Sequence, residues 1–63
     1  MKFYAYKGTY ELGKEPLGSG NKLLFSLKTI NGAIRRATRY LGNSCSVYTY
    51  TDFYDYKTFR KVK

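Results

Sequence analysis

Residues 29–42, T-I-N-G-A-I-R-R-A-T-R-Y-L-G, carry the clearest periodic pattern of apolar positions in the chain. Apolar side chains recur three and four positions apart, as along one side of an α-helix, at Ile30, Ala33, Ile34, Ala37 and Leu41. The hydroxyl of Thr29 is suited to cap the first turn, and Gly42 stands where a helix commonly ends. The pattern predicts an amphipathic helix that packs its apolar side against a core.

Alternation with a period of two predicts strands on both sides of this helix. They are expected over residues 2–7, with 9–12 as a continuation, and over 22–28, 44–51 and 57–62. The last segment is rich in charge, as an edge strand often is. The fold class is therefore α+β, with the order β-β-α-β-β and the single helix packed on one face of a small antiparallel sheet. An irregular first segment, which gives β-α-β-β, is the alternative.

Two segments between these elements are predicted to be irregular. Residues 13–21, G-K-E-P-L-G-S-G-N, hold three of the six glycines and the only proline, as a flexible hairpin connection does. Their sequence lacks the spacing of glycine, lysine and serine or threonine that defines a phosphate-binding loop. Any function of this segment is therefore expected to be contact with a partner. Residues 52–56, D-F-Y-D-Y, are typical of a turn. No boundary divides the chain, and residues 1–63 form one domain.

Composition limits how this domain can be stabilised. A chain of 63 residues has a thin core, but eight Tyr and four Phe give it large side chains to bury. Cys45 is the only cysteine, so it makes no internal disulfide; it is a small buried strand residue or, alternatively, a reactive thiol. No apolar run resembles a leader peptide or a membrane span, and we expect a cytoplasmic protein with no membrane partner.

Charge and the scarcity of catalytic side chains favour binding over catalysis. Lys and Arg number 12 against four Asp and Glu, giving a formal charge of +8, and there is no histidine. The carboxylates are at Glu11, Glu15, Asp52 and Asp55, beside the expected loop and turn, where Asp commonly forms turns. We expect no enzyme activity, no metal, no cofactor and no small-molecule substrate. The basic excess favours an anionic partner, although solubility alone also favours net charge.

The first candidate binding surface is the polar side of the predicted helix. Arg35, Arg36 and Arg39 lie opposite the apolar stripe, and Lys28 and Lys22 precede them in a stretch without acidic residues. Arg35 and Arg39 form a like-charged pair four residues apart, which disfavours the helix slightly. Guanidinium groups gathered in this way suit phosphate or carboxylate. Alternatively, Arg36 and Arg39 simply complement the dipole at the end of the helix.

The second candidate surface is the sheet face away from the helix. Four tyrosines are expected to point outward there: Tyr4, Tyr6, Tyr48 and Tyr50. Exposed rings flanked by lysines resemble the platforms on which single-stranded nucleic acids stack their bases. Tyrosine is also a good cross-strand neighbour on any solvated sheet face. The two candidate surfaces are expected on opposite sides of the domain.

These features predict a small non-enzymatic basic protein that contacts the phosphates of DNA or RNA through its arginine-rich helix face. The alternative is a protein that docks on a host protein or nucleoprotein complex through an acidic surface and inhibits or modulates it. Compact chains rich in Lys, Tyr, Asn and Phe are often encoded by phages or other mobile elements, and anti-CRISPR inhibitors are of this kind. In that case it would act in the host cytoplasm. A membrane-surface module is disfavoured because the core needs the helix's short apolar stripe.

Overall fold

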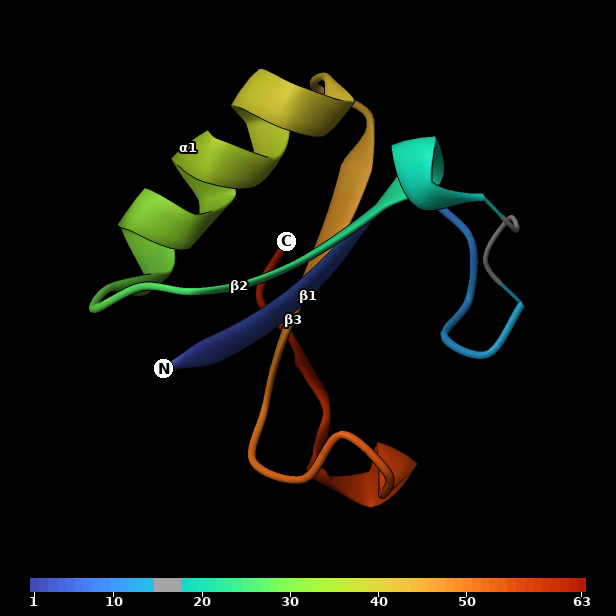
Figure 1. Ribbon diagram of the computed structural model, residues 1–63, viewed down its shortest axis with the longest axis vertical. Helices are drawn as coiled ribbons and strands as arrows, with labels where there is room; N and C mark the ends of the chain where they lie inside the picture. Colours follow the sequence, from blue (N-terminus) through green and yellow to red (C-terminus); the bar gives the residue numbers. More distant parts are fainter. Residues whose placement is uncertain (15–17) are drawn as a thin grey trace.

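One α-helix and a four-stranded antiparallel sheet form the computed structural model, which describes residues 1–14 and 18–63 (Figure 1). The elements are β1 (Lys2–Lys7), β2 (Lys22–Ser26), α1 (Ile30–Leu41), β3 (Cys45–Tyr50) and β4 (Arg60–Lys61). Two short 3-10 turns, Ser19–Asn21 and Tyr56–Thr58, precede β2 and β4. The predicted α+β class and element order are confirmed.

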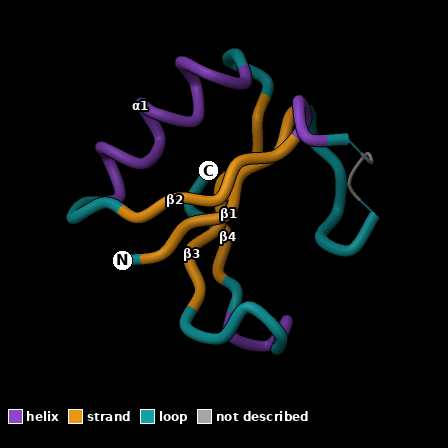
Figure 2. The backbone as a smooth tube through the Cα atoms, in the orientation of Figure 1, coloured by secondary structure: helices purple, strands orange, loops and turns teal. Residues whose placement is uncertain are grey.

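The strands follow the spatial order β2-β1-β3-β4, so β1 is an inner strand of the sheet. Figure 2 shows α1 lying to one side of the strands. Phe3 lies opposite Phe25 of β2 and opposite Thr49 of β3, and Tyr4 lies opposite Leu24 and Tyr48. Four consecutive residues of β1, from Phe3 to Tyr6, are buried. Because successive side chains point to opposite faces, β1 is covered on both of them.

Local hydrogen bonds fix both ends of α1 as the sequence predicted. The Thr29 hydroxyl oxygen accepts from the amide of Gly32 at 3.1 Å, which satisfies one of the unpaired donors of the first turn. At the other end Gly42 adopts a φ of 88°, and its amide donates to the carbonyl of Thr38 at 2.9 Å. A side chain at Gly42 would strain this backbone, so glycine ends the helix there.

Replacing Thr29 by alanine is expected to lower the free energy of unfolding by about 1 kcal/mol, because the Gly32 amide loses its partner. Urea unfolding followed by far-UV circular dichroism measures the change. The same substitution at the exposed Thr9 is the control and should shift stability by less than about 0.5 kcal/mol. Equal stability of the two variants would show that this cap contributes nothing.

The apolar side of α1 and alternate residues of the sheet form one cluster, the helix-side core. It contains Phe3, Ala5, Ala33, Ala37, Leu41, Cys45 and Val47, with the half-buried Leu23, Phe25, Leu27 and Val62 packed against it. Ala33 and Ala37 are fully buried, and their small side chains let the helix approach the sheet closely. Ile34 is only half-buried and Ile30 is 39% exposed, so the predicted stripe seats the helix mainly through its alanines and Leu41.

Tyrosines on the other set of alternate strand positions, together with rings from the connecting segments, form a second cluster, the aromatic layer. Its members are Tyr4, Tyr6, Tyr10, Tyr48, Tyr50, Phe53 and Phe59. Tyr6 is fully buried and Tyr4 is 5% exposed, because Tyr10 and Phe53 fold over them. The prediction that these tyrosines form an exposed platform is wrong for Tyr4 and Tyr6. Tyr48 and Tyr50 are half-buried within the same layer.

Two predicted strand segments are shorter in the structure. Residues 9–12 are not a strand, and of 57–62 only Arg60 and Lys61 pair as β4. Around residues 57–62 local hydrogen bonds compete with strand pairing. The Asp55 carboxylate accepts from the Lys57 amide at 3.0 Å, and the Thr58 hydroxyl donates to the Asp52 carbonyl at 2.9 Å. The turn predicted at 52–56 is present. The predicted loop 13–21 ends in the Ser19–Asn21 turn, and its residues 15–17 lie outside the described part of the chain.

Candidate functional site

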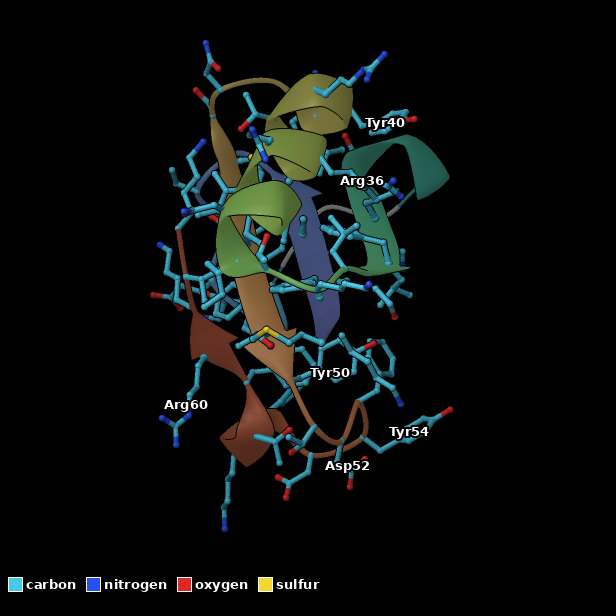
Figure 3. The ribbon with its side chains drawn as sticks, turned by 90° about the vertical axis from the view of Figure 1, so that its left-hand side faces the viewer. Arg36, Tyr40, Tyr50, Asp52, Tyr54 and Arg60 are labelled. Atoms are coloured by element: carbon cyan, nitrogen blue, oxygen red, sulfur yellow. The ribbon has the colours of Figure 1, made fainter. Side chains whose placement is uncertain are left out.

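Four exposed side chains form one stripe along α1, which we call the arginine surface: Arg35, Arg36, Arg39 and Tyr40. Their spacing of three and four residues places them on neighbouring turns of the same side of the helix. Figure 3 shows Arg36 and Tyr40 extending to the side of α1 on which β2 lies. The predicted arginines are thus brought together, and all three are exposed.

Arg36 lies over the aromatic ring of Phe25, which holds its guanidinium group in place. The guanidinium carbon lies 5.9 Å from the centre of the Phe25 ring, and Phe25 in turn stacks on the fully buried Phe3 with ring centres 5.5 Å apart. A guanidinium over a ring is attracted by its π electrons and still presents its N–H edge to a ligand. The helix-side core therefore restricts the orientation of Arg36 before any partner binds.

The arginine surface borders a shallow groove of about 370 Å³. Its lining consists of Leu27, Gly32, Arg35, Arg36, Arg39 and Tyr40. Gly32 contributes no side chain, which leaves Leu27 accessible between the helix and the end of β2. The groove thus combines three cationic groups with one large ring, Tyr40, which is 67% exposed.

Carboxylates of the described residues are engaged away from these arginines. Within residues 1–14 and 18–63 the single ion pair joins Lys14 to Glu11 at 3.5 Å. The carboxylate of Asp52 accepts from the Tyr54 amide at 3.0 Å, and that of Asp55 caps the turn before β4. The positive charge of the arginine surface is therefore not neutralised by any of these three acids.

The helix dipole accounts for only part of this surface. Arg39 is the basic residue of the last turn, where a cation is stabilised by the partial negative charge of the helix end. Arg35 and Arg36 lie further from that end, and the dipole effect is confined to the terminal turn. The helix dipole therefore does not explain the positions of Arg35 and Arg36.

The two lysines predicted beside the arginines have different positions. Lys28 is exposed between β2 and α1, and it lines a neighbouring hollow that shares Leu27 and Gly32 with the arginine groove. Lys22, at the start of β2, lies opposite Tyr6 of β1. Its side chain therefore belongs to the face of the aromatic layer, away from the helix. Lys28 therefore lies beside the candidate site, whereas Lys22 lies on the other face of the sheet.

Sequence reasoning missed Tyr40 as a site residue. The signal was present, because Tyr40 follows Arg36 by four positions and so lies on the same helical stripe. Tyrosine and arginine are both enriched among the residues that dominate binding interfaces.

No three side chains of His, Cys, Asp or Glu come together as a potential metal site within residues 1–14 and 18–63. None of the helices in this part of the chain combines the length and the apolar character needed to cross a membrane. Comparison of the chain with protein-family models, with curated proteins and with solved structures found no match.

Proposed function

We propose that this chain is a small non-enzymatic protein that binds the phosphate groups of a nucleic acid through its arginine surface. The observation that carries the proposal is the presence of three exposed guanidiniums on one stripe of α1, without an ion-pair partner among the described residues. Each guanidinium offers a planar fork of N–H donors that matches phosphate oxygens. Lys28 adds a fourth cation in the neighbouring hollow, which shares Leu27 and Gly32 with the groove.

A polyanion would also remove an unfavourable interaction of the free protein. Arg35 and Arg39 are four residues apart on one helix side, and like charges at this spacing repel each other. Phosphates between such groups neutralise the repulsion and release condensed counterions from the nucleic acid. We expect weak sequence preference and affinity that falls steeply with salt. We place this interaction in the cytoplasm, where the free buried thiol of Cys45 would stay reduced.

The test compares two variants that each remove three positive charges. R35Q/R36Q/R39Q changes the arginine surface, and K7Q/R60Q/K61Q changes exposed cations elsewhere. Figure 3 shows Arg60 on the opposite side of the molecule from Arg36. Fluorescence anisotropy with labelled single-stranded and duplex oligonucleotides, over a range of salt concentrations, gives the affinity and its salt dependence.

We expect R35Q/R36Q/R39Q to bind on the order of 100-fold more weakly at low salt. The slope of log K against log salt should fall by about 2 for single strands and about 2.7 for duplexes, because three phosphate contacts are lost. The control variant should retain most of the affinity. Equal losses in the two variants would show that net charge alone, and not the arginine surface, attracts the nucleic acid. No binding of any oligonucleotide at low salt would exclude the proposal.

The exposed Tyr40 favours docking on an acidic protein or nucleoprotein surface as a second candidate function. A tyrosine that is 67% exposed between arginines has the composition of an interface centre. An inhibitor or modulator of a host protein, encoded by a phage or another mobile element, would use it in this way. Co-purification of one host protein that resists nuclease, and that is lost in Y40A but kept in K7Q/R60Q/K61Q, would favour this function over the first.

A further inference from the structure

A second hollow lies at the other end of the molecule, between the segment after β1 and the turn that joins β3 to β4. Its volume is about 310 Å³, and its lining consists of Tyr4, Leu12, Phe53, Tyr54, Tyr56 and Phe59. Five of these six side chains are aromatic, and none lines the groove of the arginine surface. We call this hollow the aromatic pocket.

The walls of the aromatic pocket are fixed by contacts between its rings. Phe53 and Phe59 meet the buried Tyr4 edge-on, with ring centres 6.0 and 6.1 Å away and interplanar angles of 80° and 89°. Tyr56 meets Phe59 in the same manner at 5.9 Å. Edge-to-face contacts of this kind are favourable arrangements of aromatic rings. The pocket therefore exists before any ligand enters it.

Hydrogen bonds between side chains and the backbone hold the turn that carries three of these rings. The carboxylates of Asp52 and Asp55 accept from the Tyr54 and Lys57 amides, both at 3.0 Å. The Thr58 hydroxyl bridges the turn by donating to the carbonyls of Asp52 and Asp55, both at 2.9 Å. Phe53, Tyr54 and Tyr56 are thus presented on an ordered frame.

The rings at the mouth of the pocket are exposed to solvent. Tyr54 is 95% exposed, Tyr56 is 64% exposed and Phe53 is 40% exposed. Large apolar groups gathered on a surface commonly mark a place where a ligand or partner binds. Tyr54 meets Phe53 edge-on, with ring centres 5.7 Å apart, and the rest of its ring is accessible to a ligand.

We propose that the aromatic pocket receives an unpaired base of a single-stranded nucleic acid, which rests on the function proposed above. Bases are flat, and their stacking on aromatic side chains stabilises single-strand complexes with little regard to sequence. In a duplex both faces of each base are already covered by its neighbours, so the pocket selects single strands. Aromatic pockets also bind cations, but the net charge of +8 opposes a cationic ligand and attracts a strand of phosphates.

Two exposed cations lie on the segments that carry the aromatic pocket, and we assign them to the phosphates on either side of a bound base. Lys57 directly follows Tyr56 and is exposed. Lys2 is also exposed, pairs with Tyr50 across the sheet, and shares the face of Tyr4 by strand alternation. Rings that take bases, beside cations that take the backbone, are the two components of single-strand binding sites.

One side of the molecule presents side chains of both the aromatic pocket and the arginine surface. In Figure 3 the Tyr54 side chain extends to the same side of the molecule as Arg36 and Tyr40. The longest extent of the fold is 25 Å. We expect one flexible single strand that runs along this side to contact both Tyr54 and the arginine surface.

The test combines two changes: the bases are removed from the ligand, and the rings of Tyr54 and Tyr56 are removed from the protein. Wild type, Y54A/Y56A and Y54F/Y56F are titrated with a labelled oligothymidylate of about 12 nucleotides, within the range of single-strand site sizes, and with a strand of equal length made of abasic sites. We expect Y54A/Y56A to bind the intact strand about tenfold more weakly, because stacking is lost. On the abasic strand Y54A/Y56A should equal wild type. Y54F/Y56F keeps both rings and should bind the intact strand as wild type does.

Failure of this inference can be distinguished from failure of the proposed function. If wild type binds intact and abasic strands equally, or if Y54A/Y56A binds the intact strand as wild type does, the aromatic pocket takes no base, while binding through the arginine surface stands. NMR shifts of the Tyr54 and Tyr56 ring protons, upon addition of unlabelled oligothymidylate to R35Q/R36Q/R39Q, report on the pocket independently. Unchanged ring shifts at saturating strand would overturn the inference, and far-UV circular dichroism confirms that each variant is folded.

Discussion

Replacement of Tyr6 by alanine is expected to lower the free energy of unfolding by about 3–5 kcal/mol, as truncation of a buried aromatic ring in a core does. Tyr6 is fully buried in the middle of the aromatic layer. Its ring stacks on Tyr48 at 5.9 Å between centres and contacts Tyr4 at 5.8 Å. Its hydroxyl donates to the carbonyl of Tyr10, which holds the segment after β1 over the sheet. Alanine would remove all of these contacts.

Urea unfolding of Tyr6→Ala measures this loss, and two further variants divide it into parts. Tyr6→Phe keeps the ring and should cost about 1 kcal/mol, the net value of a typical hydrogen bond. Tyr54→Ala is the control, because this side chain is 95% exposed and its loss should change stability by less than about 0.5 kcal/mol. A cost below about 1 kcal/mol for Tyr6→Ala would show that the aromatic layer is not a second core.

Replacement of Phe3 by alanine should cost a similar amount, about 3–5 kcal/mol, from the opposite face of β1. Phe3 is fully buried in the helix-side core and stacks on Phe25. A domain of this length is expected to have a total stability of only about 3–9 kcal/mol. Either substitution therefore removes a large share of it, and the variant is expected to be partly unfolded at physiological temperature.

The Phe3→Ala measurement needs a readout of the helix as well as of global stability. Far-UV circular dichroism during urea unfolding supplies both, and Leu24→Ala, at a side chain that is 52% exposed, is the control. We expect Leu24→Ala to change stability far less than Phe3→Ala does. If Phe3→Ala unfolded at the same urea concentration as wild type, the helix-side core would not depend on this ring.

Local signals explain why the helix and its ends were predictable from the sequence. The period of α1, the Thr29 cap and the terminal Gly42 all depend on residues within one or two turns of each other. The grouping of Arg35, Arg36 and Arg39 follows from the same period. The order of the elements was predictable because apolar and polar residues alternate clearly in the strands on both sides of α1.

Long-range packing explains why the state of Tyr4 and Tyr6 was not predictable. Alternation correctly assigns them to one face of β1, but it does not show what covers that face. The cover consists of Tyr10, Phe53 and Phe59, which approach through segments that lack a regular pattern. The aromatic pocket arises from this same approach, so its residues carry no shared spacing in the sequence.

Coverage of β1 on both faces separates the interior of this protein from the surface proposed to recognise its partner. The four buried residues of β1 belong to two clusters, whereas Arg35, Arg39 and Tyr40 lie outside both. Substitutions among those three side chains therefore leave the interior intact. A lineage carrying this fold can alter its specificity stepwise at the helix exterior, with little risk of losing the native state on the way.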